Sequence, residues 1–167
     1  MFRRSALALV YVMGLLTVSP TFAADLPVAI INESSLSYEF SASNYDNSPT
    51  NYDNSISNYD NSISNYDNSE SNYDNSSANY DNGRNGNRRL IYRDRTSLKF
   101  VGYFVRSSNG VTNFFSPSGK RMFYNPKKGR AVFNGKDGSF CGVLANVGED
   151  FSLALTDQGV KTLLLSQ

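Results

Sequence analysis

The sequence predicts a mainly β protein, in which a low-complexity repeat tether precedes a small antiparallel meander or sandwich, or a partly open barrel. After residue 87, short apolar and aromatic runs alternate with Gly-, Asn- and Pro-containing turn signals. A spacing of about ten residues between turns is typical of antiparallel strands joined by hairpins. Residues 37–87 instead repeat a seven-residue unit, which has to be interpreted as a unit. The 167 residues therefore allow one modest domain with accessory segments.

The first segment, residues 1–23, has the pattern of a secretory signal peptide. Arg3 and Arg4 precede an apolar run over residues 5–18, and small residues follow it. The run is too short for a comfortable membrane span. We therefore expect a mature chain that starts at Ala24, is periplasmic or extracellular, and has no stable membrane anchor.

The short segment 24–36 contains a strand-like stretch, residues 26–31. We expect this stretch to pair with the C-terminal sheet across the repeat, which would hold the repeat at both ends.

The repeat has the form N-Y-D-N-S-x-S and begins with a decayed copy at residues 37–43. A coiled coil is disfavoured because Asn, Asp and Ser compete for backbone hydrogen bonds and favour turns. A single regular strand is disfavoured because an odd period sends successive tyrosines to opposite faces. The alternatives left are a string of Asx turns or a flexible chain that orders only by stacking on itself or on a partner. The repeat tyrosines are Tyr45, Tyr52, Tyr59, Tyr66, Tyr73 and Tyr80.

The C-terminal module, residues 88–167, is basic and β-rich. Its second predicted strand is apolar on both faces and is therefore expected to be central. Residues 160–165 fit either a last strand or a short helix. The expected strands are residues 90–93, 98–106, 111–115, 121–124, 131–133, 140–147 and 151–155.

Composition excludes most familiar small-enzyme chemistry. The chain has no His and one Cys, so it lacks a Ser-His-Asp or Cys-His set, a His-containing metal site and an intrachain disulfide. Cys141 lies among apolar residues and is expected to be a small buried hydrophobe, with an intermolecular disulfide as the alternative. We expect no enzyme activity, no catalytic residues, no cofactor and no metal site, unless Asp94, Asp137 or Glu149 meet in a cleft.

Charge is segregated along the chain. Residues 24–82 carry ten acidic residues and no basic one, whereas residues 83–140 carry thirteen basic residues and two acidic ones. Basic residues interleaved with aromatic ones can hold phosphates or sulfates and stack rings on sugars, although such residues also occur on ordinary solvated sheets. The candidate anion-binding residues are Arg89, Arg93, Arg95, Lys99, Lys120, Arg121, Lys127, Lys128 and Arg130.

The heptad array, followed by residues 89–92 and by a meander that ends near residues 140–142, resembles a group of exported bacterial proteins of unknown function. The resemblance implies export and no particular activity. The leading hypothesis is an exported non-enzymatic protein whose basic module binds an anionic envelope or extracellular polymer, such as a phosphorylated glycolipid or an acidic polysaccharide. Nucleic acid is an unlikely partner for an exported protein. The alternative is a self-associating, matrix-like surface protein that assembles through its repeats.

Overall fold

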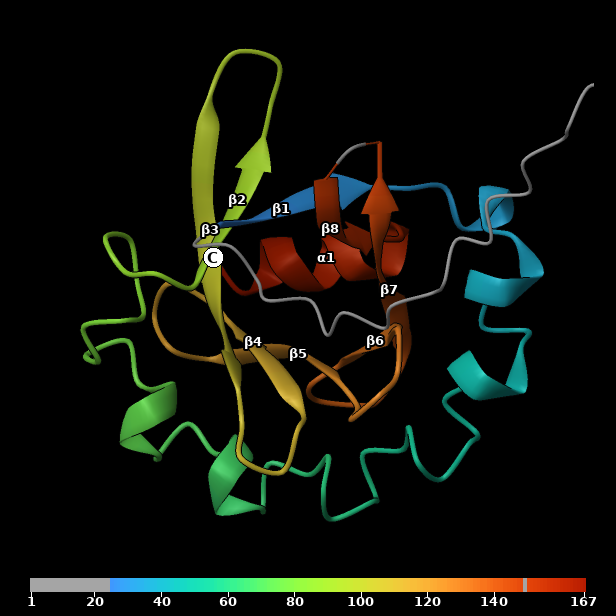
Figure 1. Ribbon diagram of the computed structural model, residues 1–167, viewed down its shortest axis with the longest axis horizontal. Helices are drawn as coiled ribbons and strands as arrows, with labels where there is room; N and C mark the ends of the chain where they lie inside the picture. The colour runs from blue at the N-terminus through green and yellow to red at the C-terminus, as the bar shows by residue number, and fades with distance from the viewer. Residues whose placement is uncertain (1–24, 149) are drawn as a thin grey trace, which may run out of the picture.

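The computed structural model describes residues 25–148 and 150–167 (Figure 1). The predicted signal peptide, residues 1–23, lies outside the described residues. Eight strands, five short 3₁₀ helices and one α-helix follow in chain order. They are β1 (Asp25–Ile30), η1 (Glu33–Ser35), η2 (Tyr38–Phe40), η3 (Tyr45–Asn47), η4 (Tyr66–Asn68), η5 (Tyr73–Asn75), β2 (Arg89–Arg93), β3 (Leu98–Arg106), β4 (Thr112–Phe115), β5 (Arg121–Asn125), β6 (Ala131–Asn134), β7 (Phe140–Val147), β8 (Asp150–Leu155) and α1 (Asp157–Leu165).

The eight strands form a closed barrel in chain order. Neighbouring strands are antiparallel except for β1, which is parallel to both β2 and β8. The expected pairing of the N-terminal stretch across the repeat is confirmed, since Leu26 is in register with Leu90 and Val28 with Leu153. The mainly β fold class is confirmed, and the barrel is closed rather than partly open because β1 supplies the eighth strand. Closure leaves no unpaired sheet edge.

The predicted strands agree with the observed ones to within one residue at each end, and β3 and β7 have the predicted bounds. The open choice for residues 160–165 is settled in favour of a helix. Its partly or fully buried residues Val160 and Leu163 are three apart, which places both on one side of α1. That side packs against the barrel.

The barrel interior is filled by apolar side chains from all eight strands, and Leu163 of α1 completes it. Cys141 is fully buried in this core, which confirms the expectation of a small buried hydrophobe. Burial raises the pKa of its thiol to about 12. The strand residues that form the core are Leu26, Val28, Leu90, Val101, Phe104, Phe114, Met122, Phe123, Val132, Cys141, Leu144, Leu153 and Leu155.

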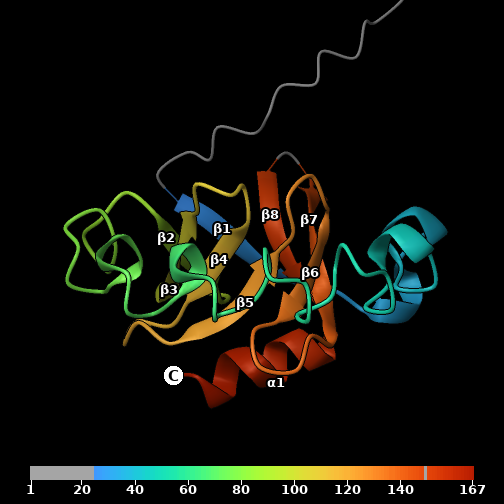
Figure 2. The ribbon, with the colours of Figure 1, turned by 90° about the horizontal axis from the view of Figure 1, so that it is seen from below.

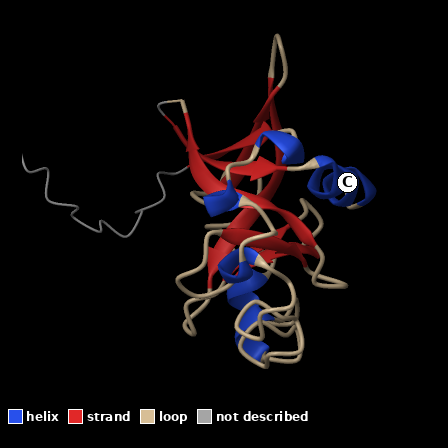
Figure 3. Ribbon diagram, turned by 90° about the vertical axis from the view of Figure 1, so that its right-hand side faces the viewer, coloured by secondary structure: helices blue, strands red, loops and turns tan. Residues whose placement is uncertain are grey.

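Residues 37–87, which we call the belt, pass around the outside of the barrel as a succession of turns and 3₁₀ helices (Figures 1 and 2). The turn-rich alternative is therefore the one that the structure shows. The belt covers a second set of apolar residues on the outer side of the strands, where Ile56 packs against the cluster of Val111, Tyr124, Ala131 and Phe133. Consequently β4 and β5 are buried along their whole length. Figure 3 shows the helical turns of the belt outside the strands, with α1 on a different side of the barrel.

Candidate functional site on the outer face of the belt

The first five complete heptads fold into the same two local turns, and the last unit, in which Gly83 replaces the first Ser, keeps the first of these turns. The first Asn of a unit accepts a hydrogen bond from the backbone N–H two residues later, as between Asn58 Oδ1 and Asp60 N at 3.1 Å. The same bond recurs in the five other complete units, so the predicted Asx turns are confirmed. The first Ser of a unit closes an equivalent turn, as between Ser55 Oγ and Ser57 N at 3.1 Å.

The second Asn of each unit turns inward and links the unit to the one before it. Asn68 Nδ2, for example, donates to the carbonyl oxygens of Asp60 at 2.6 Å and Ser62 at 3.1 Å. Equivalent pairs of bonds are made in all six units, and each of these six side chains is at most 5% exposed. Because the amide nitrogen of each inward-facing Asn donates to two main-chain carbonyl oxygens, the ladder fixes the repeat without an apolar core of its own.

Sequence reasoning did not foresee this ladder. The available signal was that the second Asn is present in all six units, whereas the residue two positions later is Pro, Ile, Glu, Ser or Arg. Asn at this position therefore has a role that Ser does not fill.

The barrel holds the belt through the belt's main-chain oxygens. Tyr103 on β3 donates to Asn75 O at 2.7 Å, and Tyr124 on β5 donates to Asn54 O at 2.8 Å. Burial beneath the belt raises the pKa of both phenols above the ordinary value of 10.0. These hydroxyls are therefore protonated at neutral pH and serve as donors to the belt.

Arg121 was predicted to bind an external anion, and this assignment is wrong. The residue is 5% exposed because the belt covers it, and its Nη2 donates to Asn61 O at 2.9 Å. Its Nε donates to Asn113 Oδ1 at 2.7 Å, and its guanidinium lies 4.8 Å from the ring centre of Tyr124. Burial lowers its pKa to about 10, so Arg121 remains charged at neutral pH and binds the chain's own repeat.

Three further candidates are paired with carboxylates of the same chain. Arg89 Nε lies 2.6 Å from Asp25, Lys99 Nζ lies 2.7 Å from Asp94, and Arg130 is bound to Glu39 of the belt. The cations of these pairs are partly exposed, so each retains access to solvent.

The remaining candidates are exposed but are not gathered on one face. Lys120 immediately precedes β5, whereas Lys127 and Lys128 follow its other end, and Arg93 and Arg95 lie at the β2–β3 turn. Anion binding by these residues stays a prediction.

The six repeat tyrosines form the most regular surface feature of the described chain. Tyr45, Tyr52, Tyr59, Tyr66 and Tyr73 are between 62% and 64% exposed, and Tyr80 is 87% exposed. Nearly equal exposure shows that the local environment repeats from unit to unit. Among the described residues, none of the six phenol groups makes a hydrogen bond with another side chain or with the backbone. In the part of the chain that the structure describes, no hydrogen bond therefore depends on the hydroxyls of these six side chains, which we call the tyrosine row.

Each tyrosine of the row is followed by an aspartate. Asp46, Asp53, Asp60 and Asp74 are exposed, while Asp67 and Asp81 are partly so. The outer face of the belt thus presents rings and carboxylates in alternation.

The acidic residues considered for catalysis do not form one cleft. Asp94 lies at the β2–β3 turn and pairs with Lys99, whereas Asp137 lies between β6 and β7 and accepts from Ser139 at 2.9 Å. Glu149 lies outside the described residues. Within residues 25–148 and 150–167, no cluster of three or more Cys, Asp or Glu residues is placed to hold a metal ion. No helix in the same part of the chain has the length and apolar character of a membrane span.

No family model, curated protein or solved structure matched the chain in the three comparisons made. The resemblance to exported repeat proteins therefore stays a prediction, and function has to be argued from the site itself.

Proposed function

We propose that this is an exported, non-enzymatic protein that binds a neutral, linear polysaccharide with the outer face of its belt. The observation that carries the proposal is the tyrosine row, whose first five members are nearly equally exposed at seven-residue intervals. A row of identical groups on a fixed frame suits a partner that is itself repetitive, because several weak contacts then add up in one complex.

The chemistry of the row favours sugars. A tyrosine ring offers a flat apolar face together with a polar hydroxyl, and loses little entropy on binding. The neighbouring carboxylates accept hydrogen bonds, and sugar hydroxyls donate them. An aromatic stack combined with charged acceptors therefore suits a polyhydroxylated ring.

Charge distinguishes neutral from anionic polymers. The carboxylates beside the tyrosines would repel an acidic polysaccharide or a phosphorylated glycolipid along the whole row. The partner proposed here therefore differs from the anionic polymer that the sequence suggested for the basic module.

Self-association through the repeats is less well supported. In that hypothesis the acidic repeat of one molecule docks on the basic module of another. The repeat is already docked on the barrel of its own chain through Tyr103, Arg121 and Tyr124. Two tyrosine rows brought face to face would also juxtapose their aspartates.

The test is a set of binding isotherms for the mature protein with amylose, cello-oligosaccharides, chito-oligosaccharides and alginate. We expect binding to at least one neutral polymer, an affinity that rises with chain length, and weak binding to alginate, the anionic probe.

The decisive variant replaces Tyr52, Tyr59 and Tyr66 together by Ser. If each ring contributes about 1 kcal/mol, each loss weakens binding about fivefold and the triple loss about a hundredfold. Ile63→Ser is the matched control, because Ile63 is an exposed apolar residue of the same belt outside the row. Unchanged affinity in the triple variant, or binding to alginate alone, refutes the proposal.

A further inference from the structure

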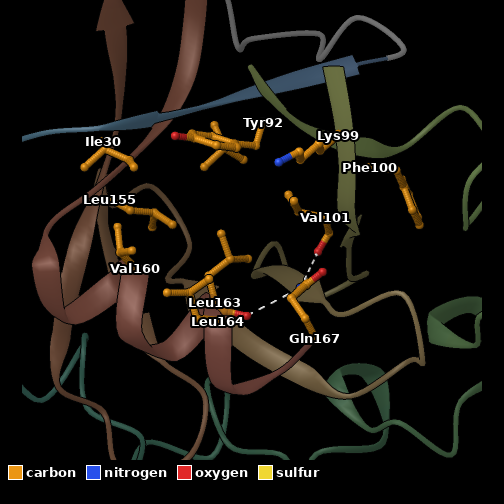
Figure 4. Close-up of a pocket in the computed structure, with 11 residues that line it drawn as sticks. Ile30, Tyr92, Lys99, Phe100, Val101, Leu155, Val160, Leu163, Leu164 and Gln167 are labelled. Carbon is orange, nitrogen blue, oxygen red and sulfur yellow. Dashed lines mark hydrogen bonds between the residues drawn. The ribbon is translucent and has the colours of Figure 1, made fainter. Parts of the chain in front are cut away.

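A cavity of about 400 Å³ opens at one mouth of the barrel, between the strands and α1 (Figure 4). Strands β1, β2 and β8 run parallel to one another, so their C-terminal ends meet at this mouth. Ile30 and Leu155 end β1 and β8, and α1 begins at Asp157, two residues after β8. The mouth of a β-barrel is a common position for a ligand pocket, and the volume lies in the range of such pockets.

The cavity has an apolar floor and an apolar rim. The floor residues are at most 8% exposed, whereas on the rim Ile30 is 52% exposed and Leu164 is 68% exposed. Figure 4 shows Ile30, Leu155, Val160 and Leu163 around the same open space. Exposed apolar residues of the rim thus lie beside buried apolar residues of the floor, which is the lining expected of a pocket for an apolar ligand. The floor residues are Val28, Val101, Leu155 and Leu163.

One cation lies at the edge of this apolar space. Among the described residues that line the cavity, Lys99 alone has a charged side chain. Its ammonium has three N–H donors, of which Asp94 takes one at 2.7 Å. Asp94 raises the pKa of Lys99, so the ammonium stays charged.

The surrounding hairpin is cationic overall. The carboxylate of Asp94 is held by the β2–β3 turn, because it accepts from Thr96 N at 3.0 Å and Ser97 N at 3.3 Å. Arg93 and Arg95 are exposed in the same turn. Three cations against one carboxylate favour an anionic group next to Lys99.

We propose that the cavity binds a free aliphatic monocarboxylate, with its chain between α1 and the barrel and its carboxylate at Lys99. In liquid water, roughly thirteen molecules occupy a volume equal to that of the cavity. A methylene group is nearly as large as a water molecule, so a chain of about ten carbons fills the space. This ligand is independent of the polymer proposed for the belt, because the cavity and the tyrosine row share no residue.

The first test is titration calorimetry with octanoate, decanoate and decanol, each below its critical aggregation concentration. Each methylene buried tightens binding about fourfold, so decanoate is expected to bind about fifteen times more tightly than octanoate. Decanoate is also expected to bind more tightly than decanol, and its binding to show a negative heat-capacity change from apolar burial.

Substitutions at three exposed positions test the contact with the carboxylate head group, the contact with the aliphatic chain, and a control site outside the cavity. Lys99→Gln is expected to weaken decanoate about fivefold and to leave decanol unchanged. Leu164→Glu places a carboxylate on the apolar rim and is expected to weaken decanoate at least tenfold. Leu165→Glu is the matched control on the same helix, since Leu165 is 88% exposed and does not line the cavity. Thermal unfolding of each variant confirms that the fold is retained.

The proposal is overturned by equal affinities for octanoate and decanoate, by an absence of decanoate binding, or by a Leu164→Glu variant that binds decanoate as the wild type does. A vesicle arm separates a free ligand from a membrane. If phosphatidylglycerol vesicles bind the protein and monomeric decanoate does not, the mouth is a membrane-docking surface and the proposal fails. Binding of polysaccharide in the same samples reports on the belt alone.

Discussion

Replacing Asn68 by Ala is expected to cost far more stability than the same change at Asn58, ten residues earlier in the belt. Asn68 is fully buried, and its side chain makes three hydrogen bonds, to Asp60 O, Ser62 O and Asn113 Nδ2. Asn58 is partly exposed and makes one good side-chain bond, to Asp60 N, and one long one of 3.4 Å, to Tyr52 O. The two changes delete the same atoms from different environments.

The magnitude follows from what each deletion leaves behind. A net contribution of about 1 kcal/mol for each of three bonds predicts a loss of about 3 kcal/mol for Asn68→Ala. The figure does not rise further, because Asp60 O keeps a bond from Asn109 and Asn113 keeps a bond to Ser107. Asn58→Ala removes one Asx turn at a partly exposed site and is expected to cost about 1 kcal/mol.

Urea unfolding followed by circular dichroism, with thermal unfolding in parallel, measures both values. For a chain of this size, about 3 kcal/mol lowers the midpoint temperature by about 6–12 °C. If Asn68→Ala costs no more than Asn58→Ala, the ladder does not hold the belt. A different outcome is a smaller dependence of the unfolding free energy on urea concentration, with the circular dichroism of the barrel strands retained. In that case the belt unfolds separately from the barrel, and hydrogen exchange at residues 44–82 will show it.

Three further predictions concern the barrel. Because burial raises the pKa of Cys141 to about 12, its thiol is expected to resist a disulfide reagent at pH 8 in the folded protein and to react at once in denaturant; equal rates would show that the site opens. Stability contributed by the neutral thiol is complete below its unfolded pKa and is lost as pH rises towards 12. Gly142→Ala is expected to destabilise the protein severely, because the φ of Gly142 is +153° and an added Cβ would meet Ala154 O at 2.0 Å. The control is Gly148→Ala, whose added Cβ meets nothing within 4 Å and which costs only backbone strain. Similar thermal unfolding midpoints for the two variants would contradict this. Lys99 lowers the pKa of Asp94 below its ordinary value of 3.8, so the pair adds stability above about pH 4 that is lost as pH falls further, and the small deficit of Asp94→Asn at pH 7 is expected to vanish in acid; a deficit that persists there would exclude the ion pair as its cause.

The barrel strands could be predicted because their signals are local. Turn residues follow one another at short intervals, and apolar residues mark each strand, so the bounds of β3 and β7 were found from sequence alone. The pairing of β1 across the repeat was expected because its apolar run had no other sheet to join. Closure itself depends on strand number and register, which no short segment encodes.

The docking of the belt was beyond the same reasoning, because its stabilising contacts are polar. From apolar residues alone, each heptad would be expected to bury its Tyr and, where present, its Ile. In the structure every row tyrosine is exposed, and of the two Ile residues only Ile56 packs against the barrel. The buried group is instead the second Asn, whose amide nitrogen donates to main-chain carbonyl oxygens of the preceding unit. Neither hydropathy nor periodicity distinguishes that Asn from the first one.

The opposite charges of the acidic belt and the basic barrel are explained in part by contacts between the two within the same chain. The belt and the barrel meet through Arg130 and Glu39, and through the backbone N–H of Arg121, which donates to Glu70 at 2.8 Å. Most other contacts are to uncharged carbonyl oxygens of the belt. Neutral hydrogen bonds therefore make up most of the contact between the belt and the barrel, and most of the aspartates beside the row tyrosines stay exposed.

Register is fixed because successive heptads use the same position to meet different barrel residues. The second Asn of five consecutive units accepts, through its main-chain or side-chain oxygen, from Tyr124, Arg121, Asn113, Tyr103 and Arg88 in turn. These residues come from β5, then β4, then β3, and then the residue before β2, which is the order of the strands around the barrel. The number of repeats is therefore matched to the path from β1 to β2 around the outside of the barrel, and the path holds the tyrosine row in one arrangement. A rigid row would lose less entropy on binding than a flexible chain with the same residues, which supports the binding role proposed for the row.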